Sequence, residues 1–523
     1  MLLTVLVVAS AVHLGAPAEP ATTNLVFRNA TIHDGSGKPG IKGDVHVKGD
    51  KIAAVGQIGK VEGATEVDAA GLVICPGFID LHTHCDPGLP GKVGRANKNY
   101  VTQGCTTVIT GNCGSGPVDV AKFFTTLEQN GVGTNVIHLA PHNSIRAQAM
   151  GNANRAPTTD EQAKMEELVD LAMKDGAWGL ATGLIYNPGT YAKTAEISAL
   201  AKVAAKHGGF YASHIRDEGS GLLDAIEEAI TIGKSAGCRV HISHIKASGK
   251  AAWGKSSDAV AVIEGHRKQG AEITADQYPY IASSTSLRAT VVPSKYREGT
   301  EKEFLARLDD PKLGPQLKAD VEKAISGRDG GKRIQIARYT PYPKWQGKNI
   351  ADIAEQEKKQ AIEIVLEIER NGGAQIVNFG MNEDDVRVYM KQPWVATASD
   401  GGVQTPGDTV PHPRSYGTFP RKIGHYAIQE KIVPVESAIR SATGLPADIL
   451  KLKDRGYIKP DYFADLVVFD PLTFRDTATF EKPHQYAAGV KWVLVNGHAE
   501  IKDGKYQEAI LGGRVLRHPT TTK

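Results

Sequence analysis

The sequence predicts an α/β protein in which a (β/α)8 barrel is joined to a small β domain built from both chain ends. Three observations support this prediction. Eight short apolar runs alternate with helix-length amphipathic stretches, polar residues capable of chemistry follow these runs, and the two ends of the chain share a hairpin-like texture. Alternating strand and helix patterns are the signature of βα units around a parallel sheet. Eight such units close into a barrel whose reactive residues lie at the carboxyl ends of the strands.

The eight predicted strands lie in runs that begin with VICPGFIDLHTH and end with WVATASDGG. In chain order these runs are residues 73–84, 105–114, 134–144, 177–186, 209–215, 238–246, 272–280 and 394–402. The stretch between the last two runs is far longer than an ordinary barrel loop and contains helix-like segments. We therefore expect part of it, around residues 285–350, to form a lid inserted before the last strand.

The two chain ends resemble each other in pattern. Residues 24–72 contain short alternating runs broken by Gly and Asp, which are typical of hairpin strands. The same texture returns within residues 446–515, so the barrel over residues 73–445 is expected to interrupt one β domain. Residues 1–18 combine an apolar run with the small residues Ala16 and Ala18, as in a signal peptide. This leader predicts a periplasmic or secreted protein, or a cytoplasmic one if the segment is not processed.

The composition of the chain limits the classes of molecule that it is expected to bind. The chain has 523 residues, of which 41% are hydrophobic and 23% charged, values typical of a folded globular protein. Its net charge is only +3, and Lys and Arg are scattered among acids, which argues against nucleic-acid binding. Beyond the leader, no segment suits a membrane span, so we expect a small-molecule substrate and no stable membrane partner. Five cysteines are too few for a dense disulfide framework.

The stretch GFIDLHTHCD points to a metal site. His82 and His84 are two residues apart on a predicted strand, so both side chains face the same way. Neutral imidazoles are good zinc ligands, although an isolated pair could equally be hydrogen-bonded core histidines. Cys113 follows the next strand between glycines that let the backbone bring a thiolate close to a metal. A buried structural cysteine is the alternative interpretation.

Three further residues end later strands of the predicted barrel. His214 and His244 hold the same position on two strands, and Asp400 ends the last strand. An aspartate before glycine is also common in turns, but the whole set at one end of a barrel favours a metal centre. His241 lies three residues before His244 and is expected to be structural, and His142 is a candidate supporting residue.

The order of several motifs resembles the N-acyl-D-amino-acid deacylases (D-aminoacylases) of the amidohydrolase superfamily over nearly the whole mature chain. The motifs are GFIDLHTH, GNCG, YASHIRDE, ISHIK, DQYPYIASST, SDGG and HPRSYGTFPR. The resemblance implies a distorted TIM barrel with a small β-sandwich made by both chain ends. It also implies a tightly bound zinc on Cys113, His214 and His244. A second, weaker metal position would lie near the remaining residues of the set, His82, His84 and Asp400, with Cys113 as the bridge.

This family implies zinc-dependent hydrolysis of N-acyl-D-amino acids to a carboxylic acid and a D-amino acid. Zinc lowers the pKa of bound water and polarises the amide carbonyl, while Asp400 transfers the proton to the leaving nitrogen. Lys246, expected on the same face as His244, offers a cation to the substrate carboxylate. Tyr278 and Ser284 resemble the family's other carboxylate-binding groups, and a core aromatic residue and a turn serine are the ordinary alternatives.

One departure from the family pattern follows the histidine pair. Cys85 stands where the family usually has an acidic residue, and we expect it not to bind metal because it points to the other face of the strand. Hydantoinases and dihydroorotases bridge their metals with a carboxylated lysine instead. No lysine stands at a suitable strand end between Cys113 and His214.

Alternative functions remain open. They are a D-configured dipeptidase, a cyclic-amide hydrolase of the hydantoinase or dihydroorotase type, and a non-catalytic metal-binding barrel. The side-chain pocket is also open, because Arg288 would suit an acidic substrate whereas Val291 and Val292 would suit an apolar one. We favour the apolar pocket, since a β-branched pair fits a pocket wall and Arg288 can point to water.

Overall fold

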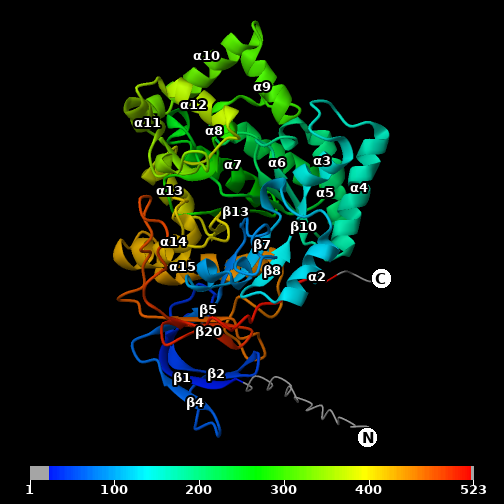
Figure 1. Ribbon diagram of the computed structural model, residues 1–523. Helices are drawn as coiled ribbons and strands as arrows, with labels where there is room; N and C mark the ends of the chain where they lie inside the picture. The colour runs from blue at the N-terminus through cyan, green and yellow to red at the C-terminus, as the bar shows by residue number, and fades with distance from the viewer. Residues whose placement is uncertain (1–22, 520–523) are drawn as a thin grey trace, which may run out of the picture.

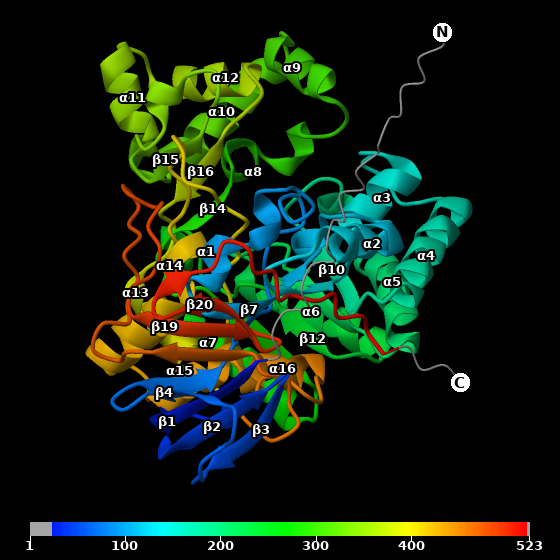
Figure 2. The same cartoon turned by 60° about the horizontal axis from the view of Figure 1, so that its bottom comes forward.

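The computed structural model describes residues 23–519, with a barrel at the centre, a β domain at one end and an inserted domain at the other (Figures 1 and 2). The predicted signal peptide, residues 1–18, lies outside the described part of the chain. Within residues 23–519, no helix has the length and apolar character needed to cross a membrane.

Eight parallel segments form the barrel. They are β6 (Phe78–Asp80), β7 (Cys105–Thr110), β8 (Asn135–His138) with its continuation β9 (Ala140–Pro141), β10 (Gly179–Gly183), β11 (Phe210–His214), β12 (Val240–Ile242), β13 (Ile273–Gln277) and β17 (Val395–Thr397). β6, β7 and β8 pair in that order, and β9 continues through β10, β11, β12 and β13 to β17. A parallel bridge between Thr83 and Gly401 joins the last strand to the first.

The barrel strands are buried on both faces, as parallel strands covered by helices must be. Every residue of β7, β10 and β11 is buried. The outer helices include α2 (Val120–Asn130), α3 (His142–Met150), α4 (Thr159–Lys174), α5 (Thr194–Lys206), α6 (Leu222–Ala236) and α7 (Ser256–Lys268). Their ends follow the expected chemistry: a capping box between Thr158 and Glu161 starts α4, and left-handed Gly237 ends α6.

Both chain ends contribute to one nine-stranded sheet. Its strands are β1 (Asn24–Ile32), β2 (Ile41–Lys48), β3 (Lys51–Gly56), β4 (Thr65–Asp68), β5 (Val73–Pro76), β18 (Leu466–Phe469), β19 (Val490–Val495), β20 (His498–Lys502) and β21 (Lys505–Tyr506). Alternate residues face different cores, so that Val468 belongs to the β domain's own core and Val467 to the core shared with the barrel.

The domain boundary differs slightly from the expected one. β5 belongs to the nine-stranded sheet rather than to the barrel, so the chain crosses between the two domains at Gly77 and not at residue 73. A side chain at Gly77 would clash with Thr106, because an added Cβ would lie 2.2 Å from its Oγ1. Glycine therefore permits the close approach of this crossing to β7.

The inserted domain lies between β13 and β17. It contains the antiparallel strands β14 (Ser283–Ser286), β15 (Ile334–Arg338) and β16 (Gln375–Asn378) and the helices α8 (Leu287–Val291), α9 (Glu301–Asp309), α10 (Leu313–Ser326), α11 (Ile350–Glu357) and α12 (Ala361–Arg370). These elements pack around a core of their own. The insertion thus spans residues 283–378, further than the expected 285–350, because β16 returns to pair with β14 and β15 after α12.

Shorter helices complete the barrel around its first and last strands. α1 (Lys98–Val101) follows β6, and α13 (Glu383–Met390) leads from the insertion into β17. After β17 come α14 (Arg414–Pro420), a π-helical segment (Arg421–Gln429), α15 (Val435–Ala442) and α16 (Gly444–Leu450). The loop between β17 and α14 brings residues of the HPRSYGTFPR motif back over the carboxyl ends of the strands.

Candidate metal centre and active site

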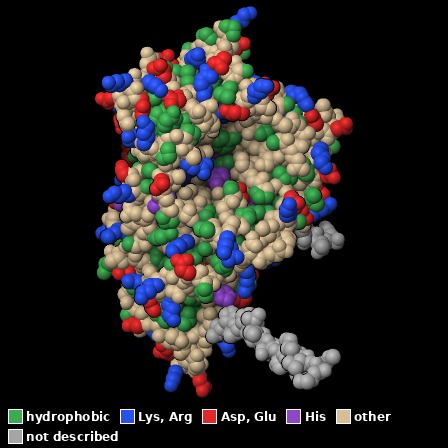
Figure 3. All heavy atoms as spheres, in the orientation of Figure 1, with side chains coloured by type: hydrophobic (Ala, Val, Ile, Leu, Met, Phe, Trp, Pro, Cys, Tyr) green, Lys and Arg blue, Asp and Glu red, His purple; other side chains and the backbone are tan. Residues whose placement is uncertain are grey.

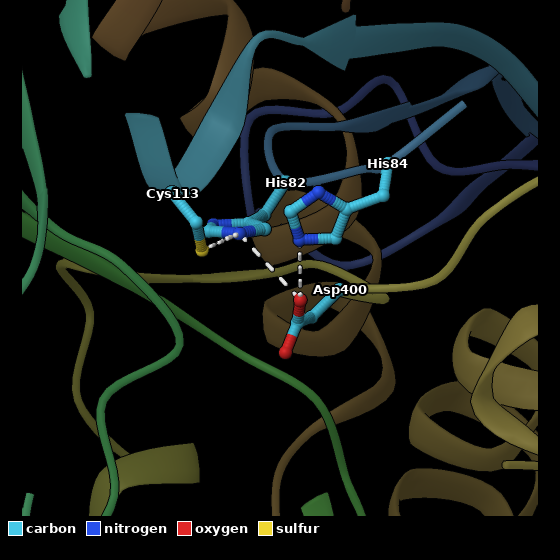
Figure 4. A group of neighbouring side chains, drawn as sticks. All are labelled: His82, His84, Cys113 and Asp400. Carbon is cyan, nitrogen blue, oxygen red and sulfur yellow. Dashed lines mark hydrogen bonds and ion pairs between the residues drawn. The ribbon is translucent and has the colours of Figure 1, made fainter. Parts of the chain in front are cut away.

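The six predicted metal ligands converge at the carboxyl ends of the barrel strands, around Cys113. The Cys113 Sγ lies 3.3 Å from His82 Nε2, 3.4 Å from His214 Nδ1 and 3.4 Å from His244 Nε2. His84 Nε2 lies 3.1 Å from Asp400 Oδ1. Figure 4 shows His82, His84, Cys113 and Asp400 pointing toward one another. Residues from the first, second, fifth, sixth and last barrel strands therefore meet at one place.

Two groups of potential ligand atoms share the cysteine. One contains His82, His84, Cys113 and Asp400 and the other contains Cys113, His214 and His244, and within each group the atoms lie within 4.8 Å of one another. Ligand sulfur and nitrogen atoms on one tetrahedral zinc are about 3.6 Å apart, given bond lengths of about 2.3 and 2.1 Å. The observed separations from Cys113 Sγ are close to this value, so the residues present fit a zinc ion.

Three of these residues have an unusual backbone. Cys113, His244 and Asp400 have φ values of 51°, 35° and 50°, in the left-handed region that residues other than glycine seldom adopt. Such conformations cost about 1–3 kcal/mol each and cluster at active sites. The fold therefore accepts local strain in order to aim these side chains at one point. Gly183 adds room, because a Cβ there would lie 2.2 Å from the Cys113 carbonyl oxygen.

A buried carboxylate, Asp276, contacts two of the predicted metal ligands, His82 and His244. Asp276 accepts a hydrogen bond from the backbone N–H of His244 (2.6 Å) and lies 2.7 Å from His241 Nε2 and 3.6 Å from His82 Nδ1. Burial opposes ionisation of Asp276, but the imidazoles of His82 and His241 outweigh it and hold the pKa well below its ordinary value. A carboxylate behind a metal-binding histidine fixes the orientation of the ring. His241 thus contacts Asp276 and not the metal-ligand group.

A second carboxylate serves the histidines of the other group. Glu218 Oε1 lies 3.1 Å from His244 Nδ1 and 3.7 Å from His214 Nε2, and it also pairs with Lys246 Nζ. Burial would raise the pKa of Glu218, but the cation of Lys246 and the neighbouring histidines hold the pKa well below its ordinary value. Glu218 therefore faces both rings on the side opposite Cys113.

The structure places Lys246 only partly as the sequence predicted. Its side chain is 5% exposed and bound to Glu218, and it is absent from the wall of the cavity beside the metal-ligand group. The prediction relied on a two-residue strand period after His244. Although β12 ends at Ile242, Lys246 does lie beside His244, with its Nζ 2.7 Å from His244 Nδ1, but its pairing with Glu218 keeps it out of the cavity wall.

A cavity of about 580 Å³ opens above the centre. Its wall includes His84, Cys113, Ser284, Asp400 and Arg414. Figure 3 shows this hollow from outside, with a histidine side chain at its base. The size and position of the cavity suit a small ligand that reaches Cys113 and Asp400.

Arg414 is the most prominent residue that the sequence left without a role. It is 4% exposed, its Nη1 lies 2.8 Å from Asp400 Oδ2, and its guanidinium lies 4.7 Å from the ring centre of Tyr278. Burial opposes ionisation of Asp400, but Arg414 outweighs it and holds the pKa of that carboxyl well below its ordinary value. All three residues lie in motifs that the sequence analysis had already singled out. Arg414 belongs to HPRSYGTFPR, Glu218 to YASHIRDE and Asp276 to DQYPY.

The other predicted substrate contacts are partly in place. Tyr278 is 2% exposed, and its hydroxyl has no hydrogen-bond partner among residues 23–519. The cations of Arg414 and Lys246 lie 4.7 and 5.6 Å from the centre of its ring. Ser284 lines the cavity, and its Oγ donates to the carbonyl of Ile376 at 2.8 Å.

The residues predicted to contact the substrate side chain do not line the cavity. Arg288 pairs with Glu301 and Glu369, and Val291 and Val292 are buried in the core of the insertion.

The remaining candidates lie outside the ligand groups. Cys85 is buried, and its Sγ is 3.9 Å from Asn97 Oδ1. Burial raises the pKa of the Cys85 thiol, which makes it a poor ligand and nucleophile. His142 Nε2 lies 3.3 Å from Glu196 Oε1, so this ring belongs to a separate buried cluster.

Comparison with known proteins identifies the family. The model of the amidohydrolase family matches residues 65–499. The chain belongs to the amidohydrolase family. The D-aminoacylase of Alcaligenes xylosoxydans xylosoxydans is 35% identical over 497 residues, covering 91% of this chain and 93% of that protein. The N-acyl-D-glutamate deacylase of the same organism is 34% identical over 516 residues, covering 94% and 96%.

A solved structure extends the likeness to three dimensions. The N-acyl-D-glutamate deacylase from Bordetella bronchiseptica, complexed with zinc and a phosphonate mimic of the tetrahedral intermediate, is 31% identical and superposes with a TM-score of 0.80. The match covers 95% of this chain and 99% of that one. These findings confirm the predicted family and fold class. They also confirm that this amidohydrolase is a metal-dependent hydrolase.

Proposed function

We propose that this amidohydrolase cleaves the amide bond of N-acyl-D-amino acids and releases a carboxylic acid and a D-amino acid. The observation that carries the proposal is Cys113, whose Sγ is shared by two groups of ligand atoms beneath a cavity that also contains Asp400. A cysteine in this position distinguishes the site from one bridged by a carboxylated lysine, as the cyclic-amide hydrolases have. Deacylases named for N-acyl-D-glutamate and N-acyl-D-aspartate are among the relatives.

Cys113, His214 and His244 would hold one tightly bound zinc, and His82, His84, Cys113 and Asp400 would form a second, weaker position. When bound, zinc polarises the amide carbonyl and lowers the pKa of water. The protein's own contribution is to hold the ligand side chains still. Asp276 and Glu218 do so from behind the rings, through the contacts described above.

Asp400 moves the proton. Its Oδ1 faces the histidine pair at the base of the cavity, while its Oδ2 is held by Arg414 at 2.8 Å. Because Arg414 keeps the carboxyl ionised, Oδ1 is ready to accept a proton from the attacking water and to pass it to the leaving nitrogen. Arg414 also restrains the carboxylate through this ion pair.

The substrate carboxylate would be bound in the part of the cavity next to Arg414. Arg414 and Ser284 line the cavity, and the ring of Tyr278, whose hydroxyl has no hydrogen-bond partner among residues 23–519, lies beside the guanidinium. We place Lys246 behind this group, where it is neutralised by Glu218 and acts through the ring of Tyr278 at 5.6 Å. Direct binding of the substrate by Lys246 would first require its release from Glu218.

A hydrolysis assay tests the proposal. Zinc-loaded enzyme should release leucine from N-acetyl-D-leucine, with slower release from N-acetyl-L-leucine and slower opening of a hydantoin. A chelator should abolish the activity, and zinc should restore it. Faster hydrolysis of the L-substrate or of the hydantoin would reject the proposal, whereas faster cleavage of a D-dipeptide would change only the acyl group.

We also propose that the protein acts in the periplasm or outside the cell. The apolar leader of residues 1–18 supports this, with Ala16 and Ala18 at a suitable cleavage site. Mass spectrometry of the protein from its native cells should show a mature N-terminus after residue 18, and a full-length chain in the cytoplasm would contradict it.

A further inference from the structure

A β-bulge in the inserted domain aims an arginine at the active-site cavity. In the pair formed by β15 and β16, Ile336 is opposite Ile376 and Arg338 is opposite Gln375, so Ala337 is an extra residue. Bulges of this kind bend a strand and redirect its side chains, and they are common beside active sites. Both Ala337 and Arg338 line the cavity above Asp400.

Arg338 also lines a second cavity, of about 590 Å³, within the inserted domain. Gln375 is the other residue shared by the two cavities, so these neighbouring side chains mark the place where the cavities meet. The second cavity is polar: its wall includes Arg288 and Glu369. Glu369 is 1% exposed, and in the described part of the chain its Oε1 has no hydrogen-bond partner. A polar extension of a substrate would suit this space better than an apolar one.

The charges around the active-site cavity leave Arg338 without a partner. Arg414 is paired with Asp400, and Arg288 in the second cavity is paired with two glutamates. Among residues 23–519, exposed Arg338 forms no ion pair or side-chain hydrogen bond, and the side chain of Gln375 forms no hydrogen bond either. A cation and an amide therefore stand together at the junction with their donors available.

We propose that Arg338 and Gln375 bind a second anionic group of the substrate, so that the enzyme prefers N-acyl-D-amino acids that carry a further carboxylate. The inference rests on the proposed function, in which the first carboxylate is held near Arg414. The second carboxylate belongs either to the amino-acid side chain or to the acyl group, the two parts of the substrate that flank the scissile amide. An arginine fork with an adjacent amide suits a carboxylate in either position.

Four substrates separate these sources. N-acetyl-D-glutamate carries the second carboxylate on the amino acid, and N-acetyl-D-glutamine is its neutral match. N-succinyl-D-leucine carries the carboxylate on the acyl group, and N-acetyl-D-leucine is its neutral match. In the wild type, kcat/KM should be about tenfold higher for at least one charged substrate than for its match, the size of one partly exposed charge-assisted hydrogen bond.

Variants at Arg338 test whether this arginine causes the preference for the charged substrate. Arg338→Gln should remove the advantage of the charged substrate while changing kcat/KM for its neutral match less than about threefold. Arg338→Lys should retain part of the advantage, and Lys332→Gln, at an exposed cation of the same domain outside both cavity walls, should change nothing. Added salt should reduce the wild-type advantage, because the arginine is exposed.

Which charged substrate depends on Arg338 identifies the source of the second carboxylate. Equal rates for charged and neutral partners in the wild type, or an equal loss for both in Arg338→Gln, would overturn this inference and leave the deacylase proposal intact. Absence of D-substrate hydrolysis altogether would instead remove the deacylase proposal.

Discussion

Replacing Glu218 by glutamine should weaken zinc binding without removing a ligand. One oxygen of this carboxylate lies 3.1 Å from His244 Nδ1 and 3.7 Å from His214 Nε2, and it pairs with Lys246. The substitution keeps the shape of the side chain and removes its charge. A hydrogen bond to a charged group contributes about 1.5–3 kcal/mol and a neutral one about 1 kcal/mol, so the loss is about 0.5–2 kcal/mol. This corresponds to a zinc Kd about 2–30-fold higher, and the upper part of this interval overlaps the range of about 10–100-fold known for residues behind metal ligands.

Chelator competition on purified protein measures this Kd. Glu218→Gln should also lower the Tm of the metal-free protein, because Lys246 would be left as a buried cation without a counterion. Adding Lys246→Met to Glu218→Gln should recover the Tm and leave zinc binding weak, which separates the two effects.

Asp465→Asn is a matched control for this experiment. It breaks a buried ion pair with Arg455 in the β domain, and it should lower the Tm with zinc affinity unchanged. A Glu218→Gln protein with wild-type zinc affinity would refute the role assigned to this carboxylate.

Three further results are expected. Cys113→Ala should lose the tightly bound zinc by elemental analysis while Cys85→Ala retains it, and zinc retained with full activity in the Cys113 variant would exclude the site as described. Asp400→Asn should retain the tightly bound zinc and lose turnover by about 10²–10⁴-fold, the usual contribution of general acid–base catalysis, and near-normal turnover would require another base. Burial lowers the pKa of Lys422 to about 7. The unfolded chain therefore binds more protons above that pH, so stability should rise from about pH 7 toward pH 10, and Lys422→Met should flatten this rise in thermal unfolding. An unchanged slope would show that Lys422 is charged in the folded protein.

The sequence was sufficient for the features that depend on local pattern. The barrel strands could be located because buried parallel strands form continuous apolar runs, and the ligands because each follows such a run. The positions of His214 and His244 needed no knowledge of long-range contacts. The sheet shared by the chain ends could likewise be expected from their common hairpin texture.

Other features depend on how separate segments meet, which local pattern does not encode. Arg414 reaches Asp400 only because the loop after β17 returns over the barrel, and Glu218 faces two rings because the segment after β11 turns back. Lys246 lies beside His244 as the sequence predicted, but its pairing with Glu218, which comes from another segment, could not be expected from the strand period. Arg338 could not be found because its direction depends on a bulge in β15, in a part of the chain that carries none of the motifs.

D-selective deacylation by a zinc centre around Cys113 is tested most directly by titrating metal-free enzyme with zinc while N-acetyl-D-leucine and N-acetyl-L-leucine are hydrolysed in parallel. We predict that activity toward the D-substrate rises in proportion to bound zinc and reaches a plateau near one equivalent. The L-substrate should be slower throughout, and Cys113→Ala should show no such rise. Full activity in the metal-free enzyme, or faster hydrolysis of the L-substrate at any zinc level, would contradict the assignment.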